Sequence, residues 1–308
     1  MISLRYHAVS IAAVFLALAV GVVLGASGVS DRLLGAVTAK ADDLTGQVQQ
    51  LSTQRDALAT AQRADDDFIR RVGPSAVRGV LQGQSVAIVS AGADGPTRDG
   101  LVALLKQAGA TVSGGVVLTS AVTDPARADQ LRQLTGTLLP AGAQLPAAAD
   151  TGSLLGGLLG GILTGPGGKA PVVGPQAAAV LSGLTTAGFL AAGNPPAPAA
   201  LVLVLTGGAS PGVDAGDGAA VVMRMAAQLD AAGGGAVLAG ATGSSDATGA
   251  VGVARADPTV TATLSTVDDV QTAAGQVSTV LALREEAAGH AGRYGTAASA
   301  ADGAAPRT

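Results

Sequence analysis

The chain has 308 residues, enough for one large or two small domains besides a membrane segment. Its net charge of −4 provides no basic surface for nucleic acid, and the absence of cysteine excludes disulfides, thiolate metal sites and a cysteine nucleophile. Aromatic residues make up only 2% of the sequence, so Ala, Val, Leu and Gly must build the core.

The first element is an uncharged run from Ala8 to Ser27. A helix of this length spans roughly 30 Å, the thickness of a bilayer's hydrocarbon core. The run is longer than the apolar part of a signal peptide, and Ala26-Ser27-Gly28 matches a cleavage site only moderately. We therefore expect a retained transmembrane helix over residues 8–28, with a cleaved signal as the alternative. The Lys and Arg residues on the two sides of the run nearly balance, so they do not decide its orientation. The short N-terminal stub (residues 1–7) has no folded domain and is expected to stay in the cytoplasm, with the bulk of the chain outside.

Two interleaved series of residues follow, each with a spacing of seven, as at the a and d positions of a coiled coil. They predict a coiled coil over residues 31–66 that joins copies of the chain into a homo-oligomer. The alternative is a lone amphipathic helix that folds back on the domain. Asp65–Asp67 are expected at a solvated helix end. The predicted interface residues are Leu34, Val37, Leu44, Val48, Leu51 and Leu58, while Ala41 and Arg55 are poorer fits to the seam.

Residues 84–290 alternate short apolar runs with helical patterns, which predicts a Rossmann-like α/β domain with a parallel sheet. Strands are expected in "QSVAIVSAG", "TVSGGVVLTS", "PAALVLVLTGG" and "AVLAGATG", and edge strands in "GAVGVARAD" and "VTATLS". Helices are expected around Leu101–Ala108, within 172–193, within 212–235 and in part of 265–289.

A glycine-rich insert over residues 146–175 and a tail over residues 291–308 interrupt or follow this pattern. The insert contains the GxxxG pairs Gly156–Gly160 and Gly157–Gly161, but its apolar part is too short to span a membrane. We expect a flexible lid or hinge, with a loop that contacts a membrane or partner as the alternative. The tail is small and polar, and disorder is expected there.

The Rossmann-like pattern raises the question of a nucleotide, but the first strand–helix turn lacks the G-x-G-x-x-G fingerprint and carries Asp94. Gly168–Lys169 is followed by Ala170, where a Walker A motif needs Ser or Thr. Gly207–Gly208 could hold an anion, yet Asp214 and Asp217 favour a self-capped helix start. No cofactor is expected.

Candidate catalytic and metal-binding residues are few. The histidines are His7 and His290, and no nucleophile elbow accompanies them, so no enzymatic activity is expected. Ser265 with Asp268 and Asp269 resembles a capping box at a helix start. The metal-ligand candidates are Met223, Met225 and His290, and the two methionines stand two apart, on different faces of a helix.

Several segments in order resemble the mycobacterial copper transport protein B family. They are "MISLRYHAVSIAAVFLALAVGVVLG", "TQRDAL", "LPAGAQL", "STVDDV", "VSTVLAL" and "GRYGT". The resemblance implies a cell-envelope membrane protein of copper efflux and copper resistance, an outer-membrane location and an oligomeric channel. It carries no ligand residues over, so copper is expected as a transported ion that is not tightly bound.

The alternation of strands and helices does not match a membrane barrel of alternating strands. Two functions therefore remain open. The first is copper transport by an oligomeric membrane protein. The second is a structural or regulatory scaffold of the envelope that binds a protein partner and transports nothing itself.

Overall fold

A computed structural model describes residues 4–26, 29–140, 143–147, 150–165, 170 and 172–306. The chain divides into two units, Met1–Asp65 and Asp66–Thr308. The side chain of Leu34, the residues Gly168 and Lys169, and part of the proposed cleavage site lie outside this description.

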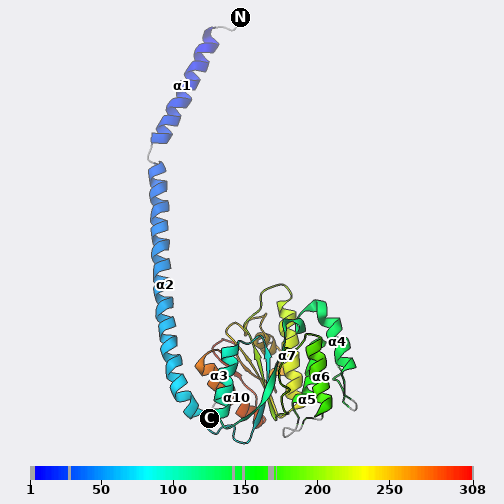
Figure 1. Cartoon of the computed structure of the whole chain (residues 1–308). Helices are drawn as coiled ribbons and strands as arrows, with labels where there is room; N and C mark the ends of the chain where they lie inside the picture. The colour runs from blue at the N-terminus through cyan, green and yellow to red at the C-terminus, as the bar shows by residue number, and fades with distance from the viewer. Residues whose placement is uncertain are drawn as a thin grey trace. The chain divides into compact units, whose positions relative to one another are not determined.

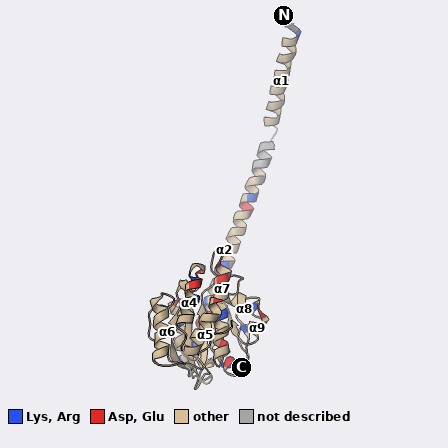
Figure 2. Ribbon diagram, turned by 90° about the vertical axis from the view of Figure 1, so that its right-hand side faces the viewer, with Lys and Arg blue, Asp and Glu red and all other residues tan. Residues whose placement is uncertain are grey.

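The first unit consists of helix α1 (Leu4–Ala26) and most of helix α2 (Val29–Ala76). The stretch Arg5–Gly25 is long and apolar enough to cross a membrane, and Figure 2 shows α1 almost free of charged residues. Its large apolar side chains are exposed, as expected for a helix that is surrounded by lipid or covered by a partner. The α2 helix does not end at Asp65–Asp67 but continues to Ala76, so the expected helix end was placed too early.

Within the described part of the second unit, six parallel strands form one sheet in the order β2-β1-β3-β4-β5-β6. The strands are β1 (Ser85–Ala91), β2 (Thr111–Val117), β3 (Leu201–Thr206), β4 (Ala236–Gly240), β5 (Ser265–Val267) and β6 (Arg293–Tyr294). The helices are α3 (Gly95–Gln107), η1 (Ser120–Val122), η2 (Pro125–Arg127), α4 (Ala128–Thr137), α5 (Thr151–Leu163), α6 (Pro175–Thr186), α7 (Ala215–Ala232), α8 (Ala250–Arg255), α9 (Pro258–Thr261) and α10 (Ala273–Ala287).

The sheet is covered on both faces, which explains the continuous apolar run of β3. Successive side chains of a strand point to opposite faces. Val202 and Val204 accordingly pack with α4, α5, α6, α7 and α8, whereas Leu201, Leu203 and Leu205 pack with α3 and α10. Figure 1 shows α3 and α10 on one side of the sheet and α4 to α7 on the other. A strand buried on both faces cannot alternate polar with apolar residues.

The glycine-rich insert contains a buried helix rather than a flexible lid. Helix α5 begins after Asp150, whose carboxylate accepts the backbone N–H of Ser153. It packs against α7, and a Cβ atom on Gly156 would lie 2.7 Å from the Met225 carbonyl oxygen. The small residues of the GxxxG pattern thus bring two helices of the same unit close together.

The C-terminal segment is held against the sheet instead of being a disordered tail. Strand β6 extends the sheet, and the carboxylate of Asp302 accepts the backbone N–H of Arg293. The Ala304 carbonyl accepts a hydrogen bond from the Ser278 hydroxyl of α10. The expected edge strand near Gly249–Asp257 is also wrong, because α8 occupies most of it. Of Val260–Ser265, the first two residues belong to α9, and strand β5 begins only at Ser265. Small apolar runs of this length fit a short helix as well as a strand.

Candidate functional site

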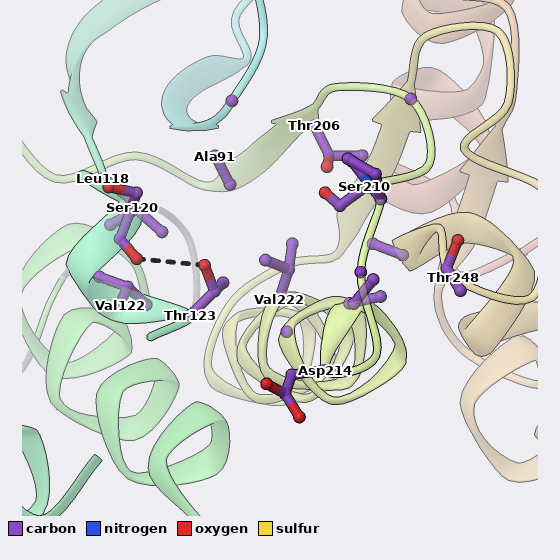
Figure 3. A pocket seen from close by; sticks show the side chains of 18 of the residues that line it. Ala91, Leu118, Ser120, Val122, Thr123, Thr206, Ser210, Asp214, Val222 and Thr248 are labelled. Carbon is purple, nitrogen blue, oxygen red and sulfur yellow. Dashed lines mark hydrogen bonds between the residues drawn. The ribbon is translucent and has the colours of Figure 1, made fainter. Parts of the chain in front are cut away.

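The candidate site is a cavity of about 590 Å³ at the carboxyl ends of β1, β2 and β3. The strand order reverses here, because the chain passes from β1 to β2 on one side and then returns to place β3 on the other side of β1. Open parallel sheets place their ligands at this kind of position. Figure 3 shows the walls: Ala91, Leu118, Ser120, Val122 and Thr123 on one side, Thr206, Ser210 and Thr248 on the other, and Val222 of α7 between them.

Close approach of backbone shapes the inner end of this cavity. Gly92 has φ of 89° and forms an isolated bridge to Thr206. A Cβ atom on Gly207 would lie 3.0 Å from the Gly92 carbonyl oxygen. Glycine adopts the φ of Gly92 at low cost, and Gly207 has no Cβ atom to crowd the Gly92 carbonyl. The loops after β1 and β3 therefore meet directly.

The electrostatics of the cavity do not suit a phosphate. Among its described lining residues the charged side chain is Asp214, and Lys, Arg and His are absent. At the neighbouring α3 terminus, the carboxylate of Asp94 accepts the Thr97 N–H at 2.7 Å, so an acid occupies the place where a nucleotide phosphate would bind. Asp214 precedes α7 but makes no side-chain capping bond, contrary to the self-capped start expected there.

The three metal-ligand candidates do not come together. Met223 and Met225 are both buried in the apolar cluster between the sheet and the helices α5 to α8, where they fill space. His290 is exposed in the turn after α10 and does not share their surroundings. The described residues contain no group of three or more His, Asp or Glu side chains that could hold a metal ion.

Asp268 and Asp269 do not begin a helix, because the N-cap of α10 is Thr272 and Ser265 lies in β5. Instead, Asp268 forms a buried ion pair with Arg255, with 2.6 Å between Oδ2 and Nη1. Arg255 also donates to the Tyr294 carbonyl and the Ser299 hydroxyl. Burial raises the pKa of Asp269 to about 6, and the nearby Asp268 carboxylate adds to this shift. These contacts join β5 to the C-terminal segment.

A second buried acid, Glu286, was missed in the sequence. Its carboxylate accepts the backbone N–H of Ser265 at 2.7 Å, and burial raises its pKa to about 8. Burial also raises the pKa of Asp230, which accepts the Ala236 N–H. Helical spacing contained the signal, because Glu286 lies three and four residues after the buried Leu283 and Ala282.

The predicted interface residues of α2 present exposed apolar side chains. Val37, Leu44, Val48, Leu51 and Leu58 are each more than half exposed, as is Phe68 further along the helix. Hydrophobic side chains of this size repeated along one helix are typical of a surface that another chain covers.

Comparison with known proteins decides the family. The model of the family described as "Copper transport outer membrane protein, MctB" matches residues 1–305. The protein called copper transporter MctB from Mycobacterium tuberculosis is 40% identical over 306 residues, which cover 96% of each chain. The protein of the same name from Mycobacterium bovis gives the same values, and the one from Mycobacterium leprae is 39% identical over 308 residues. This chain belongs to the MctB family.

The match to the MctB family model includes both the N-terminal apolar helix and the α/β unit. The cavity at the strand ends was not identified from sequence. Gly207–Gly208 marked one wall, but the hydroxyl-bearing residues after β2 and β3 are distant in sequence and meet only through the strand order.

Proposed function

We propose that this MctB family member takes part in copper transport in the cell envelope, moving copper out of the cell and conferring copper resistance. The observation that carries this proposal is the identity of 40%, over 96% of both chains, with proteins named copper transporter MctB. In this proposal α1 anchors the chain in a membrane and the Rossmann-like domain lies outside the cytoplasm. The family description supports an outer-membrane location.

Self-association is part of the proposal because one apolar helix cannot by itself enclose a polar path. The described residues contain one helix that is long and apolar enough to span a membrane. A pore would therefore need several copies of α1 or a partner protein. The exposed seam of α2 supports a parallel coiled coil that gathers these copies.

Copper is proposed to pass without a tight site. Cu(I) prefers sulfur and imidazole ligands, and the exposed His290 lies apart from the apolar cluster that buries Met223 and Met225. Conduction does not need tight binding, because the ion must leave again. The chain is proposed to have neither enzymatic activity nor a nucleotide cofactor.

Deletion of the gene tests copper transport in the native host. We expect the deletion strain to accumulate copper and to lose copper tolerance, and the wild-type gene to restore both. A gene with Met223→Leu, Met225→Leu and His290→Gln should restore them as well, because these residues form no common site. The cell copper content is measured by atomic absorption, with zinc content as a control. Normal copper content in the deletion strain would contradict the proposal.

Replacement of two seam residues tests self-association. Leu44→Asp with Leu51→Asp would force charges into a desolvated seam, so the full chain in detergent should become monomeric. The matched control is Gln50→Asp with Ala57→Asp, which adds the same charges outside the seam. Light scattering measures the mass of each complex. A monomeric wild-type chain at about 10 µM, or equal dispersal by both variants, would contradict the coiled coil.

The scaffold function is the second candidate, favoured by the single apolar helix and the scattered copper ligands. It predicts that the chain binds another envelope protein and that copper tolerance does not depend on it directly. Two results would support it: a normal copper content in the deletion strain, and an envelope protein that cross-links to this chain in the wild-type strain.

A further inference from the structure

Thr206 places an unpaired hydroxyl group in the cavity at the strand ends. It is the last residue of β3 and points to the same face of the sheet as Val204, two residues before it. The residue is only 7% exposed, and its hydroxyl makes no hydrogen bond to any residue that the structure describes. Figure 3 shows this side chain directed into the cavity, across from Val222. The hydroxyl oxygen itself is accessible from the cavity, so water or a ligand there can form a hydrogen bond with it.

The first turn of α7 contributes charge and shape to the cavity rather than free donors. Ala215 and Gly218 line the cavity, but their N–H groups donate to the Gly212 and Asp214 carbonyls. Asp214 makes no side-chain capping bond and supplies a negative charge, which disfavours a carboxylate or phosphate.

Size and lining limit the ligand further. A cavity of about 590 Å³ is much larger than a bare metal ion needs and lies in the range of sites for small organic molecules. The lining residues that the structure describes include no aromatic side chain on which a base could stack. Hydroxyl groups of Ser120, Ser210 and Thr248 alternate with the aliphatic side chains of Leu118, Val122 and Val222.

From these observations we propose that the cavity binds a small uncharged aliphatic molecule with amide groups, of the size of a capped dipeptide. A carbonyl oxygen accepts from the Thr206 hydroxyl, the amide N–H groups donate to the other hydroxyls, and the aliphatic parts contact Val122 and Val222. This site does not depend on the proposed copper transport, because no soft metal ligand is among the lining residues that the structure describes.

Binding is tested with the full chain in lipid nanodiscs by saturation-transfer NMR. The probe is N-acetyl-alanyl-alanine amide, compared with the same dipeptide carrying a free carboxylate and with inorganic phosphate, and empty nanodiscs are the blank. We expect the amide probe to bind more tightly than either anion, and Asp214→Asn to reduce this preference.

Three variants locate the site. Thr206→Val keeps the shape of the side chain but removes the hydroxyl, and should weaken binding about fivefold. Ala219→Phe fills the cavity and should abolish binding, while Thr186→Val, an exposed position of α6, should change nothing. Circular dichroism checks that each variant is folded. If the amide probe does not bind at about 10 mM, or if Thr206→Val binds it with unchanged affinity, the proposal is overturned.

Discussion

At the level of single residues, Arg255 and Asp268 form an ion pair that water hardly reaches. Their side chains are 3% and 2% exposed, and Thr266, Ser299 and the Tyr294 carbonyl accept further hydrogen bonds from the guanidinium group. The carboxylate accepts the backbone N–H groups of Thr296 and Ala297 as well. A pair of this kind specifies where the C-terminal segment lies, and loss of one partner leaves a buried charge.

Arg255→Met should therefore destabilise the α/β unit by ~3–5 kcal/mol, because Asp268 would stay buried without its cation. The matched control is Arg293→Met. The Arg293 side chain is 38% exposed and lies 3.4 Å from Asp302, so its loss should cost at most ~1 kcal/mol. Urea unfolding of the full chain in detergent, followed by circular dichroism, measures both. If both variants lose the same free energy of unfolding, burial of the Arg255–Asp268 pair does not have the effect expected here.

Glu286 gives the stability a dependence on pH. Its pKa is about 8 in the folded chain against an ordinary value of 4.5, so folding favours the protonated form. This contribution is fully present below pH 4.5 and is lost as the pH rises through about 8. Asp230 and Glu285 are the acids that act on it, and Tyr294 donates its hydroxyl to Glu285.

Glu286→Gln should make stability less sensitive to pH, because glutamine resembles the protonated acid and keeps an oxygen for the Ser265 N–H. The difference in unfolding free energy between variant and wild type should grow in favour of the variant from pH 5 to pH 8.5. Asp269, whose pKa is about 6, acts in the same direction at lower pH, so Asp269→Asn serves as the comparison. A pH-independent difference between the Glu286 variant and the wild type would contradict the assignment.

At the level of elements, contact between α5 and α7 depends on residues without side chains. Along α5, Gly152, Gly156 and Gly160 face α7, and a Cβ atom on Gly156 would also lie 2.7 Å from Cβ of Gln228. Gly161 is in the same helix but has no heavy atom near the place of its missing Cβ. The two positions thus separate packing from helix propensity.

Gly156→Ala should destabilise the unit by ~1–3 kcal/mol, because the helices must move apart. Gly161→Ala should instead stabilise it by ~0.5–1 kcal/mol, since alanine has the higher helix propensity and meets nothing. The midpoints of urea unfolding should shift in opposite directions. A stabilising effect of both changes would show that α5 is not pressed against α7.

The sequence was informative about these elements where periodicity and burial agree. The runs "VAIV" and "LVLVL" are apolar at every position and predicted strands β1 and β3 well. The insert at α5 was misjudged because its glycines suggest flexibility, although glycine is also the residue that two close helices require. The sites were harder to predict: Thr206 and Asp214 come together with Ser120 only through the order of the strands, and no local pattern encodes that order.

At the level of the whole chain, α1 differs in kind from the α/β unit. It offers exposed apolar side chains such as Phe15 at 69%, whereas the second unit buries residues of the same type. A helix with this surface needs a membrane or other apolar partner. We therefore predict that the mature protein retains this helix.

The mature protein from its native host should keep the residues of α1. Intact mass spectrometry of the membrane fraction should give a mass near 29.4 kDa. As a control, insertion of a strong cleavage site after Ala26 should release the chain into the soluble fraction. A native mass that corresponds to a start near Ser27 to Val29 would show that the run is a cleaved signal.

The contacts of the last residues have a consequence for export. Arg255 obtains the Tyr294 carbonyl and Ser299 as partners, and Ser278 obtains the Ala304 carbonyl, only after the end of the chain has been made. A chain threaded through a membrane from its N-terminus would therefore carry an unfinished domain until the C-terminus arrives. In the proposed topology, with the α/β unit outside the cytoplasm, delayed closure of this kind would keep the polypeptide extended during translocation. A chain truncated by a premature stop codon would expose Arg255 and the edge of β5 to proteases.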